Sequence, residues 1–196
     1  MQLIRVGRSA VLAEVADAAA AHSLAVFARR AGVPAGEVVP AARSVLFDDV
    51  SDPGRIEELL AGWSPEQPPT GAVVELPVVY DGEDLTDVAE RWGTDPDGVV
   101  ERHTSLEFVS AFCGFAPGFA YLSGLPSELA VPRLDSPRTR VPAGAVGIAG
   151  TWCAAYPTAS PGGWRLLGRT EVALWDPGRE QPALLPPGTR VRFRPA

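Results

Sequence analysis

Histidine is the side chain that most readily transfers protons near neutral pH, and this sequence has two, His22 and His103. His103 lies at the end of a predicted helix and just before an aromatic strand, so the negative end of the helix dipole would favour its imidazolium form. His103 is therefore a candidate for a catalytic acid or base. The alternative is a helix-capping histidine without chemistry. His22 lies inside an earlier predicted helix and is expected to be structural.

A second candidate is a cluster of guanidinium groups spaced by prolines, in the run PRLDSPRTRVPAG. Guanidinium groups match carboxylates and phosphates, and prolines reduce the entropy that is lost when a side chain is held in place. We predict a catalytic role for Arg138 and Arg140, in which one of them holds a carboxylate or carboxyphosphate. The alternative is that members of this cluster, which includes Arg133, form surface ion pairs with a nearby acid such as Asp135. Arg169 has the same two interpretations.

The run GFAPGFAY, residues 114–121, has the composition of a binding loop. Glycines on both sides of the proline let backbone N–H groups face a ligand, and the aromatic rings provide an apolar floor. The predicted ligand-binding residues of this loop are Phe115, Ala116, Pro117, Gly118, Phe119 and Tyr121. The alternative is a buried turn, and we expect at least one of the two phenylalanines to belong to the core.

The run SPGGW supplies further predicted binding residues, which together with Arg169 are Ser160, Gly162, Gly163 and Trp164. The G-x-S-x-G arrangement of a serine hydrolase is absent, so we favour a tight turn that places Trp164 in a cleft wall over a serine nucleophile. Cys113 lies in an apolar strand, where thiols are usually inert. With two histidines and two cysteines this far apart, we expect no metal site.

Composition restricts the classes of function. The 17 basic residues are all arginine, which excludes a Schiff-base lysine and a phosphate-loop lysine within this chain. The net charge of −7 leads us to expect no nucleic-acid partner. Residues 1–107 hold 19 acids and 8 arginines, whereas residues 108–196 hold 5 acids and 9 arginines, so the second half suits a small carboxylate-bearing substrate. Two cysteines, no membrane-length apolar run and no signal-peptide pattern predict a cytoplasmic protein without a membrane partner.

The elements that would position these residues form two predicted domains. Residues 1–71 have an α+β pattern, with helices that begin after Asp17 and Asp52. Their last part, residues 64–71, has the composition of a linker. Residues 72–196 have two short helices and then short apolar runs separated by turns, which predicts a barrel or a sandwich. The predicted helices are 85–92 and 96–103, and the predicted strands are 73–80, 106–113, 146–149, 166–167, 172–175 and 191–193.

Three motifs taken together, GFAPGF-Y-L, PR-PRTRVPAG and SPGGW, closely resemble the bacterial family called allophanate hydrolase subunit 1, KipI or the B-type subunit of 5-oxoprolinase. The resemblance spans nearly the whole chain. It implies a small α+β domain over residues 1–71 and a cyclophilin-like β-barrel over residues 72–196. It also favours the catalytic interpretation of His103, because a histidine at this place belongs to the family pattern. The run around Cys153 departs from the family, in which a more polar, glycine-containing stretch is usual.

The resemblance implies a component of an ATP-dependent 5-oxoprolinase, which opens the lactam 5-oxoproline to glutamate. Its partners would be a homologous larger cyclophilin-like subunit, of the kind called allophanate hydrolase subunit 2 or the C-type subunit of 5-oxoprolinase, and an amidohydrolase-type third subunit. ATP would be the cofactor of the complex, and this chain would be inactive alone. We predict that His103, the 115–121 loop and Arg138 or Arg140 face a shared cleft. The alternatives are a KipI-like inhibitor that binds a sensor histidine kinase, and a module of urea carboxylase or allophanate metabolism.

Overall fold

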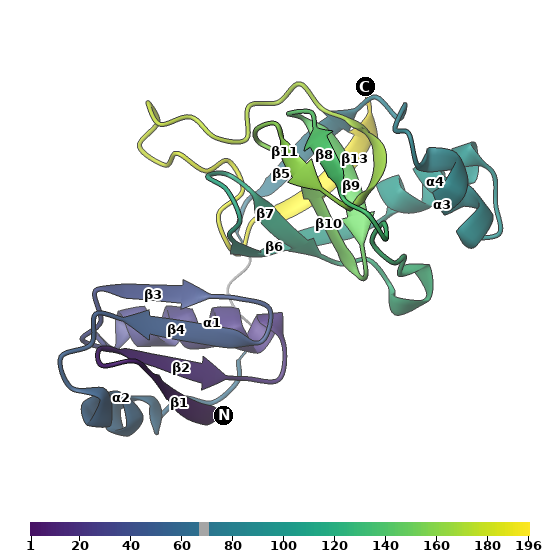
Figure 1. The fold of residues 1–196 in the computed structure, drawn as a ribbon. Helices are drawn as coiled ribbons and strands as arrows, with labels where there is room; N and C mark the ends of the chain where they lie inside the picture. Colours follow the sequence, from purple (N-terminus) through teal and green to yellow (C-terminus); the bar gives the residue numbers. More distant parts are fainter. Residues whose placement is uncertain (67–70) are drawn as a thin grey trace. The chain divides into compact units, whose positions relative to one another are not determined.

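The computed structural model divides the chain into two units, Met1–Thr70 and Gly71–Ala196 (Figure 1). The first unit encloses one hydrophobic cluster of buried residues, and the second encloses two. The structure describes residues 1–66 and 71–196. Residues 67–70 of the predicted linker therefore lie outside the described residues.

The first unit is a four-stranded antiparallel sheet with helix α1 against it. The strand order is β1 (Gln2–Val6), β2 (Ala10–Glu14), β4 (Ser44–Asp48) and β3 (Glu37–Pro40). Alternate strand residues such as Val45 and Phe47 are fully buried, as are residues on one face of α1 such as Leu24. Every second side chain of these strands points to the face of the sheet that packs on the helix, and these side chains form the core.

Aspartate caps begin both helices of the first unit. The side chain of Asp17 accepts a hydrogen bond of 2.8 Å from the Ala20 N–H at the start of α1 (Ala18–Arg30). The side chain of Asp52 accepts one of 3.0 Å from the Gly54 N–H at the start of α2 (Pro53–Leu60). The predicted starts of these two helices are confirmed, because an N-cap aspartate is a local sequence signal.

The second unit is a seven-stranded sheet that closes on itself as a barrel (Figure 1). Val79, directly after β5, and Arg169 of β12 exchange two backbone hydrogen bonds of 2.9 Å, which joins the two ends of the sheet. The predicted α+β class with a β-barrel is therefore confirmed. The strand order is β12 (Arg165–Arg169), β9 (Ala145–Ala149), β10 (Trp152–Ala155), β7 (Ala120–Ser123), β6 (Glu107–Cys113), β13 (Arg190–Pro195) and β5 (Val73–Val78).

Smaller elements surround the barrel. Helix α3 (Leu85–Arg91) contacts β12, and helix α4 (Pro96–Ser105) contacts β13. A short 3-10 turn, η1 (Ser127–Leu129), follows β7. A separate two-stranded sheet consists of β8 (Arg138–Val141) and β11 (Ser160–Gly162), and it carries part of the motif region.

The predicted strand at residues 172–175 is wrong. These residues lie in the long connection between β12 and β13, where an isolated bridge joins Trp175 to Ala183. Leu174 is buried in the barrel core, and Val172 packs against that core. The run is therefore apolar because it covers barrel residues, and not because it pairs in the sheet.

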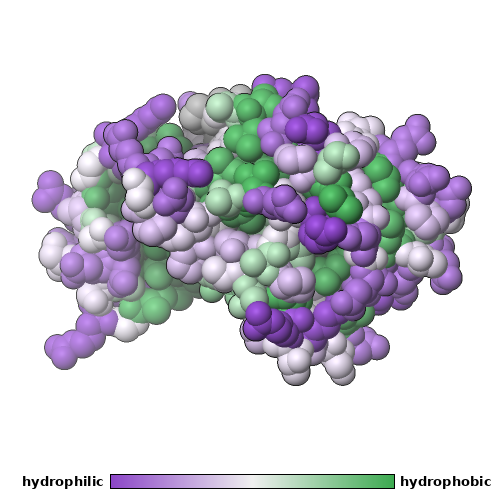
Figure 2. All heavy atoms as spheres, turned by 90° about the horizontal axis from the view of Figure 1, so that it is seen from above, coloured by the Kyte–Doolittle hydropathy of each residue, from purple (hydrophilic) through white to green (hydrophobic). Residues whose placement is uncertain are grey.

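The described surface is mixed in polarity. On the face drawn in Figure 2, hydrophobic residues reach the surface in several places between hydrophilic ones. Phe115 is the most exposed of the large hydrophobic side chains in the described ranges, at 62%. No helix within residues 1–66 and 71–196 is both long and apolar enough to cross a bilayer.

Candidate functional site

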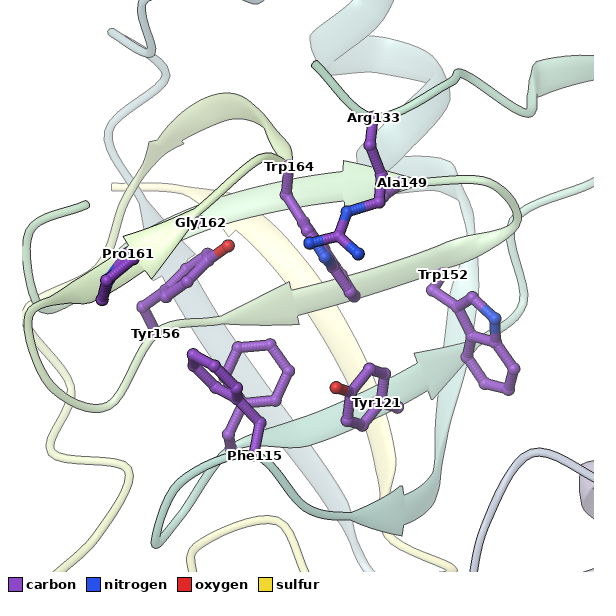
Figure 3. A pocket seen from close by; sticks show the side chains of 10 residues that line it. Phe115, Tyr121, Arg133, Ala149, Trp152, Tyr156, Pro161, Gly162 and Trp164 are labelled. Atoms are coloured by element: carbon purple, nitrogen blue, oxygen red, sulfur yellow. The ribbon is translucent and has the colours of Figure 1, made fainter. Parts of the chain in front are cut away.

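A pocket with a cavity volume of about 300 Å³ opens on the barrel unit, and Figure 3 shows the side chains around it. We call it the aromatic pocket; its lining residues are Phe115, Phe119, Tyr121, Arg133, Ala149, Trp152, Tyr156, Pro161, Gly162 and Trp164. Six of these are aromatic, and Arg133 carries the one charge among them. The predicted binding residues that it brings together are Phe115, Phe119, Tyr121, Gly162 and Trp164.

Phe119 is the centre of the aromatic packing. Its ring meets Tyr121, Tyr156 and Trp164 edge to face, with centroids 5.0, 5.3 and 5.7 Å away. Such pairs contribute about 0.5–1.5 kcal/mol each beyond the area they bury. Phe119 is also buried, so the expectation that at least one of the two loop phenylalanines belongs to the core is confirmed.

Phe115 lies at the open edge of the same pocket. Its backbone φ is 69°, in the left-handed region that non-glycine residues rarely occupy. Its ring packs edge to face on Phe119 with centroids 5.2 Å apart, while most of the side chain stays exposed. Backbone strain of this kind is concentrated at functional sites, and here it presents an aromatic ring at the mouth of a cavity.

Gly162 makes room for Tyr156. A Cβ atom at position 162 would lie 2.5 Å from the Tyr156 hydroxyl, closer than real contacts allow. Glycine at position 162 therefore lets β11 pass directly beside this phenol. Gly162 thus shapes the pocket by having no side chain.

The polar groups of the aromatic pocket are a guanidinium and two phenols. In Figure 3 the guanidinium of Arg133 and the hydroxyls of Tyr121 and Tyr156 lie around the centre of the pocket. Burial raises the pKa of both phenols above the ordinary value, and the Arg133 charge offsets part of this rise in pKa. Both phenols are therefore protonated at neutral pH and can donate a hydrogen bond.

The lining residues of the aromatic pocket carry groups that can bind a ligand by packing and hydrogen bonding. None of the ten lining side chains is a carboxylate, an imidazole or a thiol. One cation and two neutral O–H donors suit an anion that also carries a carbonyl oxygen. The ten lining side chains therefore offer no carboxylate, imidazole or thiol as a general base or nucleophile.

The structure places His103 in the barrel core, away from the aromatic pocket. Its side chain is fully buried, and its ring packs on Phe108 and Phe193 with centroids 5.3 and 4.5 Å away. Burial lowers its pKa to about 3, so the expectation that it titrates near neutral pH is wrong. Desolvation of the imidazolium exceeds the effect of the helix end, because the ring faces apolar side chains and not solvent.

Arg138 forms ion pairs with two acidic residues of the barrel unit. It donates two hydrogen bonds of 2.8 Å to the carboxylate of Asp84 and one of 3.2 Å to Glu83. The ion-pair alternative therefore holds for Arg138, although with acids from the start of α3 and not with Asp135. Arg140 is exposed and lies outside the lining of the aromatic pocket.

Arg133, and neither Arg138 nor Arg140, lines the aromatic pocket. The Leu134 N–H donates a hydrogen bond of 2.8 Å to the Gly163 carbonyl, which holds the neighbouring Arg133 beside Trp164. Within the described ranges Arg133 has no ion-pair partner. The sequence offered no signal that separates Arg133 from its two neighbours, because a contact with residue 163 decides between them.

Several predicted residues lie beside the aromatic pocket without lining it. Gly118 packs against Leu174 and Trp175, and a Cβ there would lie 2.7 Å from the Trp175 Cβ. The side-chain oxygen of Ser160 is buried without a hydrogen-bond partner among the described residues. Arg169 pairs with Asp81 and lines a second, wider cavity of about 410 Å³. The others that do not line the aromatic pocket are Ala116, Pro117 and Gly163.

Of the lining aromatics, Tyr156 was expected in a cleft wall from the sequence, whereas Trp152 was not predicted. Both flank Cys153 in the run that departs from the family pattern, and their aromatic character was the available signal. Cys153 itself is fully buried, and burial raises its pKa. Cys113 and Cys153 are free thiols, and no group of His, Cys, Asp and Glu side chains in the described part of the chain is placed to hold a metal ion.

Comparison with known proteins gives the family. The model of the family "Carboxyltransferase domain, subdomain C and D" matches residues 1–185. The B-type subunit of the 5-oxoprolinase of Escherichia coli O157:H7 is 48% identical over 145 residues, which are 71% of this chain and 66% of that protein. The chain matches between 59% and 66% of the length of three curated relatives with this name.

Two solved structures extend the comparison. The crystal structure of TTHA0988 is 40% identical with a TM-score of 0.80, over 95% of this chain and 40% of that chain. The urea carboxylase of Kluyveromyces lactis is 21% identical with a TM-score of 0.74, over 99% of this chain and 21% of that chain, and shows the fold alone. The chain belongs to the carboxyltransferase domain, subdomain C and D, family, and its predicted resemblance to the B-type subunit of 5-oxoprolinase is confirmed.

Proposed function

We propose that this chain is a substrate-binding component of an ATP-dependent 5-oxoprolinase complex and that the aromatic pocket binds 5-oxoproline. The observation that carries the proposal is the composition of the pocket, with one guanidinium and two neutral phenols inside an aromatic wall. The name of the curated relatives, which are B-type subunits of 5-oxoprolinase, supports the same substrate.

Each part of the small lactam has a matching group. Its carboxylate pairs with the Arg133 guanidinium, which has no ion-pair partner within the described residues. Its carbonyl oxygen accepts a hydrogen bond from the hydroxyl of Tyr121 or Tyr156. Its ring methylenes pack on the faces of Phe119 and Trp164. These three contacts orient the lactam oxygen toward the polar part of the pocket.

ATP and partner proteins supply what the pocket lacks. An unactivated lactam is a poor electrophile, and transfer of a phosphoryl group to its oxygen creates a leaving group before water attacks the ring carbon. The lining residues include no base or nucleophile for these steps. The homologous larger subunit and the amidohydrolase-type subunit would contribute them, and this chain would be inactive alone.

Binding of two related lactams tests the proposal. 5-Oxoproline and 2-pyrrolidinone share the ring and the carbonyl, but only the first has a carboxylate. We expect Arg133→Ala to weaken 5-oxoproline binding about 10- to 100-fold, because a charge-assisted pair is lost, and to leave 2-pyrrolidinone binding unchanged. Arg133→Lys should recover part of the affinity. Isothermal titration calorimetry measures all of these constants.

Arg179→Ala is the matched control, since Arg179 is an exposed arginine paired with Asp176 outside the pocket. It should bind both lactams as the wild type does. Wild-type 5-oxoproline affinity in Arg133→Ala would contradict the proposal. So would 5-oxoproline-dependent ADP release by the chain in the absence of partners.

A further inference from the structure

A largely buried ion pair joins the start of α3 to β8. The side chains of Arg138 and Asp84 are 19% and 9% exposed, and the Arg138 Nη2 atom lies 2.8 Å from both carboxylate oxygens of Asp84. Neither residue lines the aromatic pocket. The pair is therefore outside the site that the proposed function uses.

Both members of this pair also hold the backbone of a pocket wall. Arg138 donates a hydrogen bond of 3.3 Å to the carbonyl of Trp164, a lining residue. Asp84 accepts a hydrogen bond of 2.7 Å from the Leu166 N–H, and its own N–H donates one of 3.1 Å to the Leu166 carbonyl. The carbonyl and N–H groups on both sides of position 165 are thus fixed by one ion pair.

The same wall segment is tied to Arg133 from the other direction. The Gly163 carbonyl accepts the hydrogen bond of the Leu134 N–H at 2.8 Å. A shift of residues 163–166 would consequently move Trp164 and the backbone next to Arg133 together. The α3 region is linked to the segment once more, because Arg165 lies 2.7 Å from Asp87.

We propose that Asp84 and Arg138 are positioning residues that set the place of Trp164 and Arg133 in the aromatic pocket. The relevance of the proposal to catalysis rests on the proposed function of that pocket. Loss of Arg138 leaves a buried carboxylate without its counter-charge, and such a group draws in water or changes its partners. The wall segment that shares its hydrogen bonds then moves, and a displacement of about 1 Å is enough to reduce ligand affinity or turnover.

Fluorine NMR tests the positioning without a ligand. The protein is labelled with 5-fluorotryptophan, and the Trp164 resonance is assigned by its absence in Trp164→Phe. We expect Arg138→Ala to shift the Trp164 resonance and Arg138→Lys, which keeps one charged donor, to return it toward the wild-type position. Arg190→Ala is the matched control, because Arg190 makes hydrogen bonds of 2.7 and 2.8 Å to Glu107 away from the pocket. It should leave the resonance unchanged.

A binding measurement on the same variants completes the test. We expect Arg138→Ala to weaken 5-oxoproline binding about tenfold, with recovery in Arg138→Lys and no change in Arg190→Ala. An unchanged Trp164 resonance in folded Arg138→Ala would overturn the proposal. If that variant does not fold, an unchanged resonance in Asp84→Asn, which keeps the acceptor for Leu166, would overturn it equally. A wild type that binds no 5-oxoproline removes the proposed function, while the fluorine result still decides the positioning role.

Discussion

At the scale of single residues, two contacts hold the ring of His103 inside the barrel. The Tyr80 hydroxyl lies 2.8 Å from Nδ1, and the Cys153 sulfur lies 3.4 Å from Nε2. Burial raises the pKa of both Tyr80 and Cys153, so both partners stay protonated and the imidazole stays neutral. Because a neutral ring has one donor and one acceptor nitrogen, both positions are satisfied without a charge. His103 joins α4 to β10 across the core.

This burial predicts a pH dependence of stability. The pKa of His103 is about 3 in the folded chain, against an ordinary value of 6.5. The unfolded chain therefore binds the proton first as pH falls, so the stabilisation is complete above pH 6.5 and is lost on acidification below it. From pH 7 to pH 4 this one group lowers the free energy of unfolding by about 3 kcal/mol.

Urea denaturation at several pH values measures this effect. We expect the free energy of unfolding of His103→Gln, a non-titrating variant, to fall less between pH 7 and pH 4 than that of the wild type. His22→Gln, in the other unit, serves as the control for the barrel transition. A wild-type His103 ring resonance that titrates between pH 5 and 8 would contradict the prediction.

At the scale of elements, the sequence predicted the features that depend on neighbouring residues and missed those that depend on contacts between distant residues. Helix starts at Asp17, Asp52 and Asp95 were predictable, because a cap and the residues after it are adjacent in the chain. The strands that were not predicted are β3, β7, β8, β10 and β11, which have only three or four residues each and are defined by their partner strands. The same distinction applies to the site. The aromatic loop and the SPGGW turn were identifiable from their local sequence. The position of Arg133 in the pocket depends instead on a hydrogen bond between Leu134 and Gly163, which are 29 residues apart in the chain.

The cap of α4 allows a prediction about one element. The Asp95 side chain accepts a hydrogen bond of 2.8 Å from the Gly98 N–H. We expect Asp95→Ala to lower the free energy of unfolding of the barrel unit by about 1 kcal/mol, because a helix N–H loses its acceptor. Hydrogen exchange of the barrel amides measures the change. Asp52→Ala, which removes the equivalent cap from α2, should affect amides of the first unit only; a loss of barrel protection in that variant would contradict this assignment.

At the scale of the whole molecule, the two units differ in that the aromatic pocket lies in the second unit. The hydrophobic cluster of the first unit is made of residues up to Trp63, and the two clusters of the second unit are made of residues after Val73. All ten residues that line the aromatic pocket belong to the second unit. The ion pair that we propose as a positioning device, Asp84 with Arg138, lies there as well. The aromatic pocket and the fold that supports it therefore belong to residues 71–196.

This division predicts that a fragment of residues 71–196 folds alone and binds 5-oxoproline with the affinity of the whole chain. The barrel closes on itself through Val79 and Arg169, so none of its seven strands needs a partner from the first unit. Near-ultraviolet circular dichroism reports whether the aromatic packing is retained, and calorimetry compares the affinities. Arg133→Ala in the fragment should lose the same factor in affinity as in the whole chain. A folded fragment that binds at least tenfold more weakly than the whole chain would contradict the assignment of the site to residues 71–196.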